Sequence, residues 1–478
     1  MNLAISKQHG LSSLYSSFIG YSLLFLLATI PLQWIVLFKF LNLALRPTQI
    51  ILFVTFSLIF FYLVVFNKKI YDLKNVIGIF IGFYAFYLMT LIFALFWTQD
   101  LKSGVSIIIK YSTYFLSFLV IVQLILLLPD YKRAYFFSIA IPIGIFLFCG
   151  IVSYIYIDLG RNILTDYAAS ILAGDEKAVQ YGFYPTIFNY SFTGVARRET
   201  DEYISNSLRN TMVGGFILYY IVLKMYKNFS IPGFFNNYFF IIVKKISIFL
   251  SFLLVILSLS RSNMIILFFA IMFSYLLSVL KPRVIKITKT QFRKYMMVTA
   301  LIALLIPTVT FLIKDYLLNS YKMIESRFED LGHDSRIGMY ENALKEIGNN
   351  IIIGKGLGVE IEGSEGKASG RVHNFFLSSW VEAGIFGFIG SLLTYFSIVL
   401  IWFFYTFNIL IEKRTWELNT SFEWTMTLPI IPLFRCLVSG GGGALTSIEW
   451  FCLSLFFACL YRNEYLFWTN KKLIKQHN

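Results

Sequence analysis

The chain has 478 residues and a formal net charge of +15 at pH 7, with 58% hydrophobic, 19% aromatic and only 14% charged residues. A soluble protein of this length cannot bury so much apolar surface, which excludes water-soluble enzymes and binding modules. Apolar runs of about twenty residues recur along the whole sequence, and they predict an all-α polytopic membrane protein forming a single integral membrane domain over residues 1–478.

About twelve transmembrane helices are predicted from these runs. The first is expected to be a retained helix, because it follows a polar start and has no small-residue cleavage site of a signal peptide. The eleventh is interrupted by Pro429 and Pro432 and carries Arg435. The predicted spans are 14–38, 47–66, 76–97, 110–129, 135–157, 212–226, 243–259, 262–280, 295–314, 380–407, 424–438 and 448–461.

Basic residues alternate between the short loops and predict the orientation of the helices. With about twelve helices, the basic clusters all fall on one side, and the positive-inside rule makes that side cytoplasmic together with both termini. The densest cluster is expected to contact anionic lipid headgroups rather than nucleic acid. The clusters are Lys68, Lys69 and Lys74; Lys132 and Arg133; Lys224, Lys227, Lys244 and Lys245; Lys281, Arg283, Lys286, Lys289, Arg293 and Lys294; and Lys471, Lys472 and Lys475.

Two long loops, 158–211 and 315–373, then fall on the outer face of the membrane. Both are slightly acidic, in contrast to the positive chain as a whole, and neither has the strand alternation of an independent domain. Short amphipathic helices are predicted at 317–327 and 339–347. The loops are therefore expected to cap the outer mouth of the helix bundle.

Arginines gather at this outer boundary, and they are the main functional signal. A guanidinium is always charged, and its planar fork of donors matches phosphate oxygens. Arg261 stands in the tight link Ser260-Arg261-Ser262 between two predicted helices, where a charged residue without a specific role is not expected. The alternative for each arginine is a structural ion pair or a side chain that reaches back to the interface. The other candidates are Arg197, Arg198, Arg209, Arg336, Arg371 and Arg435.

His373 is the second signal, because it stands with Asn374 where the second loop re-enters apolar sequence. A histidine at this position can accept a proton near neutral pH, although it could also only satisfy backbone groups at a helix start. No spacing of His, Cys, Asp or Glu predicts a metal site, and no cofactor is expected. The glycines Gly354, Gly356 and Gly358 lack the context of a nucleotide-binding loop and are expected to form a tight turn close to the first long loop.

Several of these residues together resemble the shared core of the O-antigen polymerase and O-antigen ligase superfamily. The resemblance rests on Ser260-Arg261, on Ser335-Arg336 with Asn342, and on the glycine-containing segment 351–358. It continues through His373-Asn374 and Glu382-Ala-Gly384-Ile-Phe-Gly387, and covers about residues 260–390 closely. These motifs are typical of the superfamily and do not identify a member.

The resemblance implies inverting, metal-independent glycosyl transfer on the periplasmic face of the bacterial inner membrane, with an undecaprenyl-pyrophosphate leaving group. It places His373 and Arg261 at catalytic positions and, more loosely, Arg209. Substrate binding is expected from Arg336, Arg371, Arg197, Arg198, Arg435, Asn374 and Glu382. Expected partners are the undecaprenyl-pyrophosphate-linked oligosaccharide, membrane lipid and a chain-length regulator protein, but no nucleic acid.

Three functions remain open at this stage. A polymerase joins lipid-linked repeat units, and it is favoured because the chain is longer than a typical ligase and its first loop is idiosyncratic. An O-antigen ligase would transfer the finished polysaccharide to lipid A–core. A non-enzymatic transporter of lipid-linked oligosaccharide is disfavoured, because such a protein requires charges along the middle of the bundle, where this sequence has few.

Overall fold

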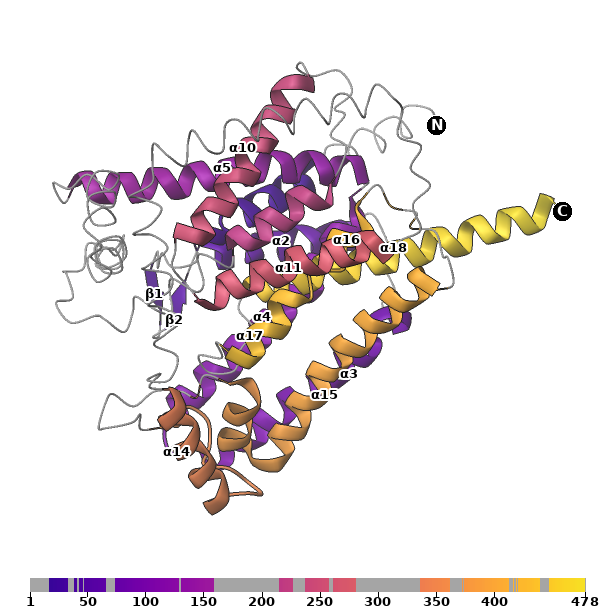
Figure 1. Ribbon diagram of the computed structural model, residues 1–478. Helices are drawn as coiled ribbons and strands as arrows, with labels where there is room; N and C mark the ends of the chain where they lie inside the picture. Colours follow the sequence, from indigo (N-terminus) through magenta and orange to yellow (C-terminus); the bar gives the residue numbers. More distant parts are fainter. Residues whose placement is uncertain are drawn as a thin grey trace.

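The protein is described by a computed structural model, in which helices dominate and one short hairpin is the only sheet among the described residues. The described residues are 17–32, 38–40, 43–45, 47–65, 74–128, 130–158, 215–226, 237–257, 261–280, 336–361, 372, 374–411, 416, 418, 420–438 and 447–477. Figure 1 shows the helices packed as a bundle, with α3 and α15 side by side and the C-terminal part of α18 projecting from it.

The elements follow the apolar runs of the sequence. Apolar helices at Ser17–Ala28 and Gly215–Met225 add to the labelled elements. The latter are η1 (Ile30–Leu32), β1 (Phe38–Phe40), β2 (Leu43–Leu45), α2 (Pro47–Val65), α3 (Lys74–Ala94), η2 (Leu95–Trp97), α4 (Leu101–Leu127), α5 (Asp130–Asp158), α10 (Asn237–Leu257), α11 (Arg261–Leu280), α14 (Arg336–Asn349), α15 (Phe375–Ile411), α16 (Phe422–Thr425), α17 (Ile430–Val438) and α18 (Ser447–His477).

Six helices in the described part of the chain are long and apolar enough to cross a membrane. They are Ile77–Trp97, Leu101–Leu127, Lys132–Gly150, Phe239–Ile256, Asn263–Leu280 and Phe375–Leu410. Each contains most of a predicted span, so a polytopic membrane protein is confirmed. The total of about twelve stays a prediction, and the predicted span 295–314 lies outside the described residues.

Two predicted spans differ from the structure. The span 14–38 is too long, because its helix ends near Ala28, the turn η1 contains Pro31, and residues 38–40 pair with 43–45 as a hairpin. Proline has no N–H to continue a helix, whereas the apolar sequence gives no sign of the stop. The span 424–438 is broken into α16 and the nine-residue α17, with Pro429 between them.

An aromatic core fixes the start of α18 against α3 and α4. The buried Trp450 ring lies 4.9 Å from Tyr84, 5.4 Å from Phe118 and 6.0 Å from Phe80, measured between ring centroids. Ring contacts of this kind combine apolar burial with a specific geometry. Because Glu449 directly precedes Trp450, this packing also determines where the Glu449 carboxylate lies.

Candidate functional site

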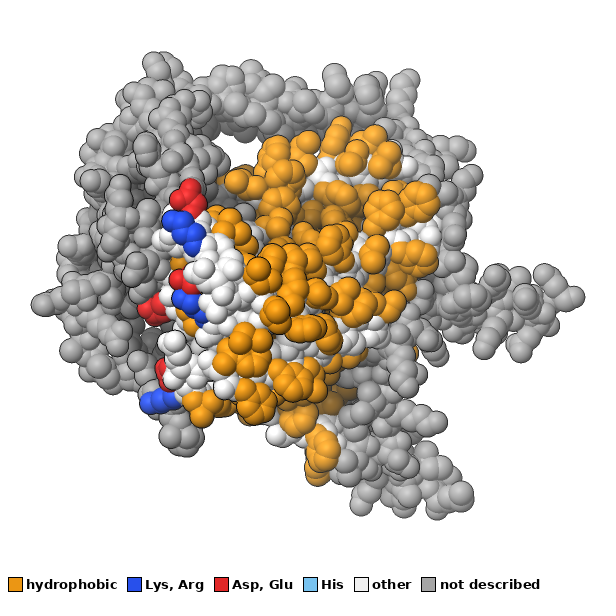
Figure 2. Space-filling view, turned by 90° about the horizontal axis from the view of Figure 1, so that it is seen from below, with side chains coloured by type: hydrophobic (Ala, Val, Ile, Leu, Met, Phe, Trp, Pro, Cys, Tyr) orange, Lys and Arg blue, Asp and Glu red, His pale blue; other side chains and the backbone are white. Residues whose placement is uncertain are grey.

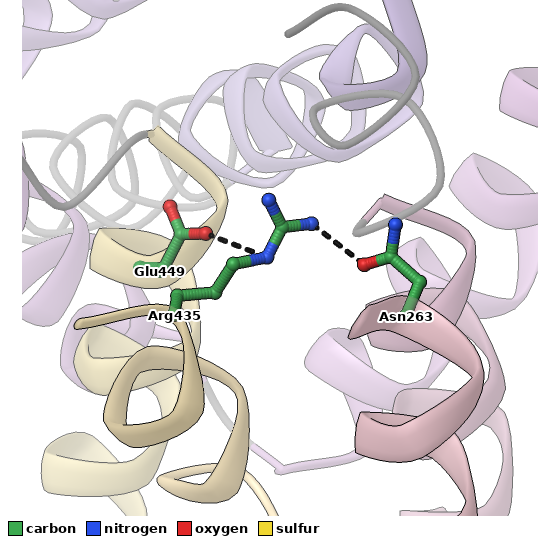
Figure 3. Close-up of polar contacts among 3 residues, drawn as sticks. All are labelled: Asn263, Arg435 and Glu449. Atoms are coloured by element: carbon green, nitrogen blue, oxygen red, sulfur yellow. Dashed lines mark hydrogen bonds and ion pairs between the residues drawn. The ribbon is translucent and has the colours of Figure 1, made fainter. Parts of the chain in front are cut away.

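The starts of three helices, α11, α15 and α18, meet around α17. Arg435 on α17 donates from Nη2 to Oδ1 of Asn263, 2.8 Å away, in the first turn of α11. On its other side, Nε of Arg435 lies 3.5 Å from Oε1 of Glu449, in the first turn of α18 (Figure 3). Asn374, which precedes α15, donates from Nδ2 to the backbone oxygen of Leu437, two residues beyond Arg435, at 3.3 Å.

The polar groups at this junction are deeply buried. Arg435, Glu449 and Asn263 are 5%, 1% and 0% exposed. The 3.5 Å separation of the ion pair exceeds the roughly 2.7–2.9 Å of a direct charge-assisted hydrogen bond. A charge buried at this depth requires a partner, and here the partners come from two other helices. The contacts therefore hold α11 and α18 in fixed positions against α17.

Asn374 has a second role at the start of α15. Its Oδ1 accepts hydrogen bonds from the backbone N–H groups of Phe376 and Leu377, at 3.0 and 3.1 Å. This is the ordinary chemistry of an N-cap, in which a side-chain oxygen satisfies otherwise unpaired donors of the first turn. Both ends of the Asn374 carboxamide are thus engaged, which favours a positioning role over direct contact with substrate.

The predicted catalytic residues flank these contacts in the sequence. Arg261 is the first residue of α11, two positions before Asn263, and His373 directly precedes Asn374. The side chain of Arg261 and the whole of His373 lie outside the described residues. The structure therefore brings the two segments that carry these residues to the same junction.

The remaining predicted site residues are described only in part. Arg336 is the first residue of α14, without a described side chain, and the predicted amphipathic helix 339–347 is confirmed within α14. Arg197, Arg198, Arg209 and Arg371 lie outside the described residues, so their roles stay predictions. Glu382 is described and buried, with Oε1 3.4 Å from the backbone nitrogen of Gly358.

Residues 354–358 are here called the glycine turn. Backbone N–H groups of this turn donate to carbonyl oxygens of α15 in place of donors from the helix itself. Gly384 has φ +67° and interrupts α15, which frees backbone groups on either side of the kink. The freed oxygens of Val381 and Glu382 accept from the N–H groups of Lys355 and Gly356, at 2.7 and 3.0 Å. Buried backbone groups must be paired, so this exchange compensates the kink.

Glycine is required on both sides of this exchange. Gly354, Gly356 and Gly358 all have positive φ, between 71° and 94°. A Cβ on Gly384 would lie 2.0 Å from the backbone oxygen of Ile352, and one on Gly356 would lie 2.6 Å from Cα of Thr98. The predicted tight turn is confirmed, and its described neighbours are α15 and the link between η2 and α4. The first long loop, its expected neighbour, lies outside the described residues.

Sequence reasoning missed Glu449 and Asn263. Arg435 was identified as a charge within an apolar segment, and such a charge implies a nearby partner. Glu449 is the acidic residue at the start of the next apolar run, and a search for that partner would have found it. Asn263 carries no comparable signal, because a single amide in the first turn of a helix is common. Among the described residues, no group of three or more His, Cys, Asp or Glu could hold a metal ion.

Comparison with known families matches residues 246–392 to the O-antigen ligase family. The matched segment runs from α10 into α15 and includes Arg261, Asn263, the glycine turn and Asn374. Arg435 and Glu449 lie beyond it, although Arg435 contacts it through Asn263. Comparison with curated proteins gives no match to this chain.

Proposed function

Because residues 246–392 match the O-antigen ligase family, we propose that the chain is a polymerase of lipid-linked oligosaccharide repeats on the periplasmic face of the inner membrane. The observation that carries the proposal is the family match over residues 246–392. Two helix starts within this segment carry the motifs, at Arg261 and at His373-Asn374, and these two starts meet around α17. The membrane helices supply the setting that a lipid-linked substrate requires.

The charge distribution at the junction suits a pyrophosphate. The N-terminal ends of α11, α15 and α18 meet there through the contacts of Asn263, Asn374 and Glu449. The N-terminus of a helix carries a partial positive charge and attracts anions. Arg261, at the start of α11, adds a full positive charge. We assign to Arg261 the stabilisation of the negative charge that develops on the leaving pyrophosphate.

The proposed reaction is a single displacement with inversion. A hydroxyl of the incoming lipid-linked repeat attacks the anomeric carbon of the growing chain. The bond between that carbon and the phosphate oxygen breaks, and undecaprenyl pyrophosphate leaves with the bonding electron pair. The hydroxyl proton passes to His373. The lengthened chain then remains on the lipid carrier of the incoming repeat.

Lipopolysaccharide from cells lacking this gene tests the proposed function. For a polymerase, we expect core oligosaccharide that carries a single repeat, and a ladder of longer chains restored by the wild-type gene. Bare core, with long chains accumulating on undecaprenyl pyrophosphate, would instead identify a ligase. An unchanged ladder would contradict both functions, and the non-enzymatic transporter as well, because all three supply the ladder.

A further inference from the structure

Three consecutive isoleucines form an exposed apolar turn between α14 and the glycine turn. Ile351, Ile352 and Ile353, here called the isoleucine turn, are 51%, 65% and 52% exposed. Isolated exposed apolar residues are ordinary, but a contiguous group calls for an explanation. The neighbouring helices also expose apolar side chains. Leu344 on α14, which precedes the turn, and Phe386 on α15, which holds it, are each more than half exposed.

The backbone of the isoleucine turn is held by α15. The oxygen of Ile351 accepts from the N–H of Ile385 at 3.0 Å and from the indole Nε1 of Trp380 at 3.2 Å. The oxygen of Ile352 accepts from the same Ile385 N–H at 3.3 Å. Irregular backbone can lie at membrane depth only where protein satisfies its polar groups, and these two carbonyls meet that condition.

The position of the turn along the bundle is given by α3. The span Ile77–Trp97 has 21 residues, and at about 1.5 Å per residue it covers roughly 31 Å, close to the thickness of a hydrocarbon core. With both termini cytoplasmic, as the basic loops predict, Trp97 is at the outer end of this span. Because α3 packs antiparallel to the long part of α15 with Tyr87 beside Gly390, Ile385 on α15 corresponds to about Ile92 on α3.

Tryptophan, such as Trp97 at the end of this span, is typical of the boundary between headgroups and acyl chains. α15 folds back on itself at Gly384, because Trp380 stacks on Phe388 with ring centroids 4.4 Å apart and Phe376 lies 5.2 Å from Tyr395. The isoleucine turn binds α15 at Ile385, directly after this reversal and about five residues inside the level of Trp97. Its side chains thus lie at or below the interface, next to a surface that already faces lipid.

From these positions we infer that the isoleucine turn inserts into the outer leaflet and contacts phospholipid acyl chains. The exposed apolar surface continues from the turn onto Phe386, Ile389 and Phe396 of α15. Figure 2 shows a broad apolar face on which charged side chains gather along one edge. Insertion would fix the glycine turn and the reversal of α15 at Gly384 at the depth of a lipid-linked pyrophosphate.

Spin-label accessibility measures this insertion directly in the full-length protein. A nitroxide is attached at Ile352→Cys, with Cys149, the exposed cysteine, replaced by Ala. The protein is placed in vesicles of phosphatidylethanolamine and phosphatidylglycerol. Matched labels at Phe403→Cys, on the lipid-facing side of α15, and at Lys345→Cys, on the exposed side of α14, provide the membrane and water references.

We expect the label at position 352 to resemble the one at 403, with high accessibility to molecular oxygen and low accessibility to water-soluble nickel(II) ethylenediaminediacetate. Nickel accessibility equal to that at position 345 would place the turn in water and overturn the inference. Low accessibility to both reagents would mean that protein, including a second copy of this chain, covers the turn. The result does not depend on enzymatic activity, so it can fail while the proposed function stands.

Discussion

Replacing His373 or Arg261 by alanine is expected to reduce glycosyl transfer about 100- to 1,000-fold, the usual cost of removing one charged or proton-transferring group from such a site. The reason differs between the two residues. In the proposed reaction, the His373 variant loses the group that accepts the proton of the attacking hydroxyl, and the Arg261 variant loses a charge that stabilises the leaving pyrophosphate. The rate of chain extension in isolated membranes measures both effects.

Matched variants separate chemistry from general damage to the outer loops. His333→Ala removes another histidine of the second loop and should retain full activity. Arg261→Lys keeps the charge but loses the planar fork of donors, so intermediate activity is expected. If His373→Ala and Arg261→Ala are present at wild-type levels and extend chains at the wild-type rate, the assigned site is wrong.

Arg435→Met is expected to lower the free energy of unfolding by about 3–5 kcal/mol, because it leaves the Glu449 carboxylate buried without its cation. Asn263 would lose its 2.8 Å hydrogen bond at the same time. Both consequences loosen the starts of α11 and α18 at the candidate site. Unfolding of the purified protein by dodecyl sulfate in mixed micelles measures the change.

The double variant Arg435→Met with Glu449→Met is the informative control. Removing both charges leaves neither member of this ion pair buried without its partner, so much of the lost stability should return. Lys345→Met, which removes an exposed cation from α14, should have little effect. A single Arg435→Met variant as stable as the wild type would show that the buried contacts of Arg435 do not hold these helices together.

The sequence was sufficient to predict the elements that depend on local composition. The predicted span 262–280 corresponds closely to α11, and 76–97 to Ile77–Trp97, because each is a long apolar run bounded by polar residues. The predicted span 380–407 lies within α15, but the helix starts five residues earlier, at Phe375 after its N-cap Asn374. Such signals lie within a few residues of the feature that they predict.

Features that depend on distant parts of the chain could not be predicted. The kink at Gly384 is compensated by Lys355 and Gly356, about thirty residues earlier, and a glycine in an apolar helix does not reveal such pairing. The ion pair and hydrogen bond of Arg435 join three helices, and of these residues Asn263 carried no signal in the sequence. The hairpin after the first helix was missed because its residues are as apolar as a membrane span.

The most direct measurement is chain extension by the purified wild-type protein in liposomes that contain a single undecaprenyl-pyrophosphate-linked repeat as the only saccharide. The proposed polymerase should convert this substrate to products with two or more repeats, still attached to undecaprenyl pyrophosphate and formed without lipid A–core. The polymerase function would be contradicted if no extension occurs, or if the saccharide is transferred only when lipid A–core is added.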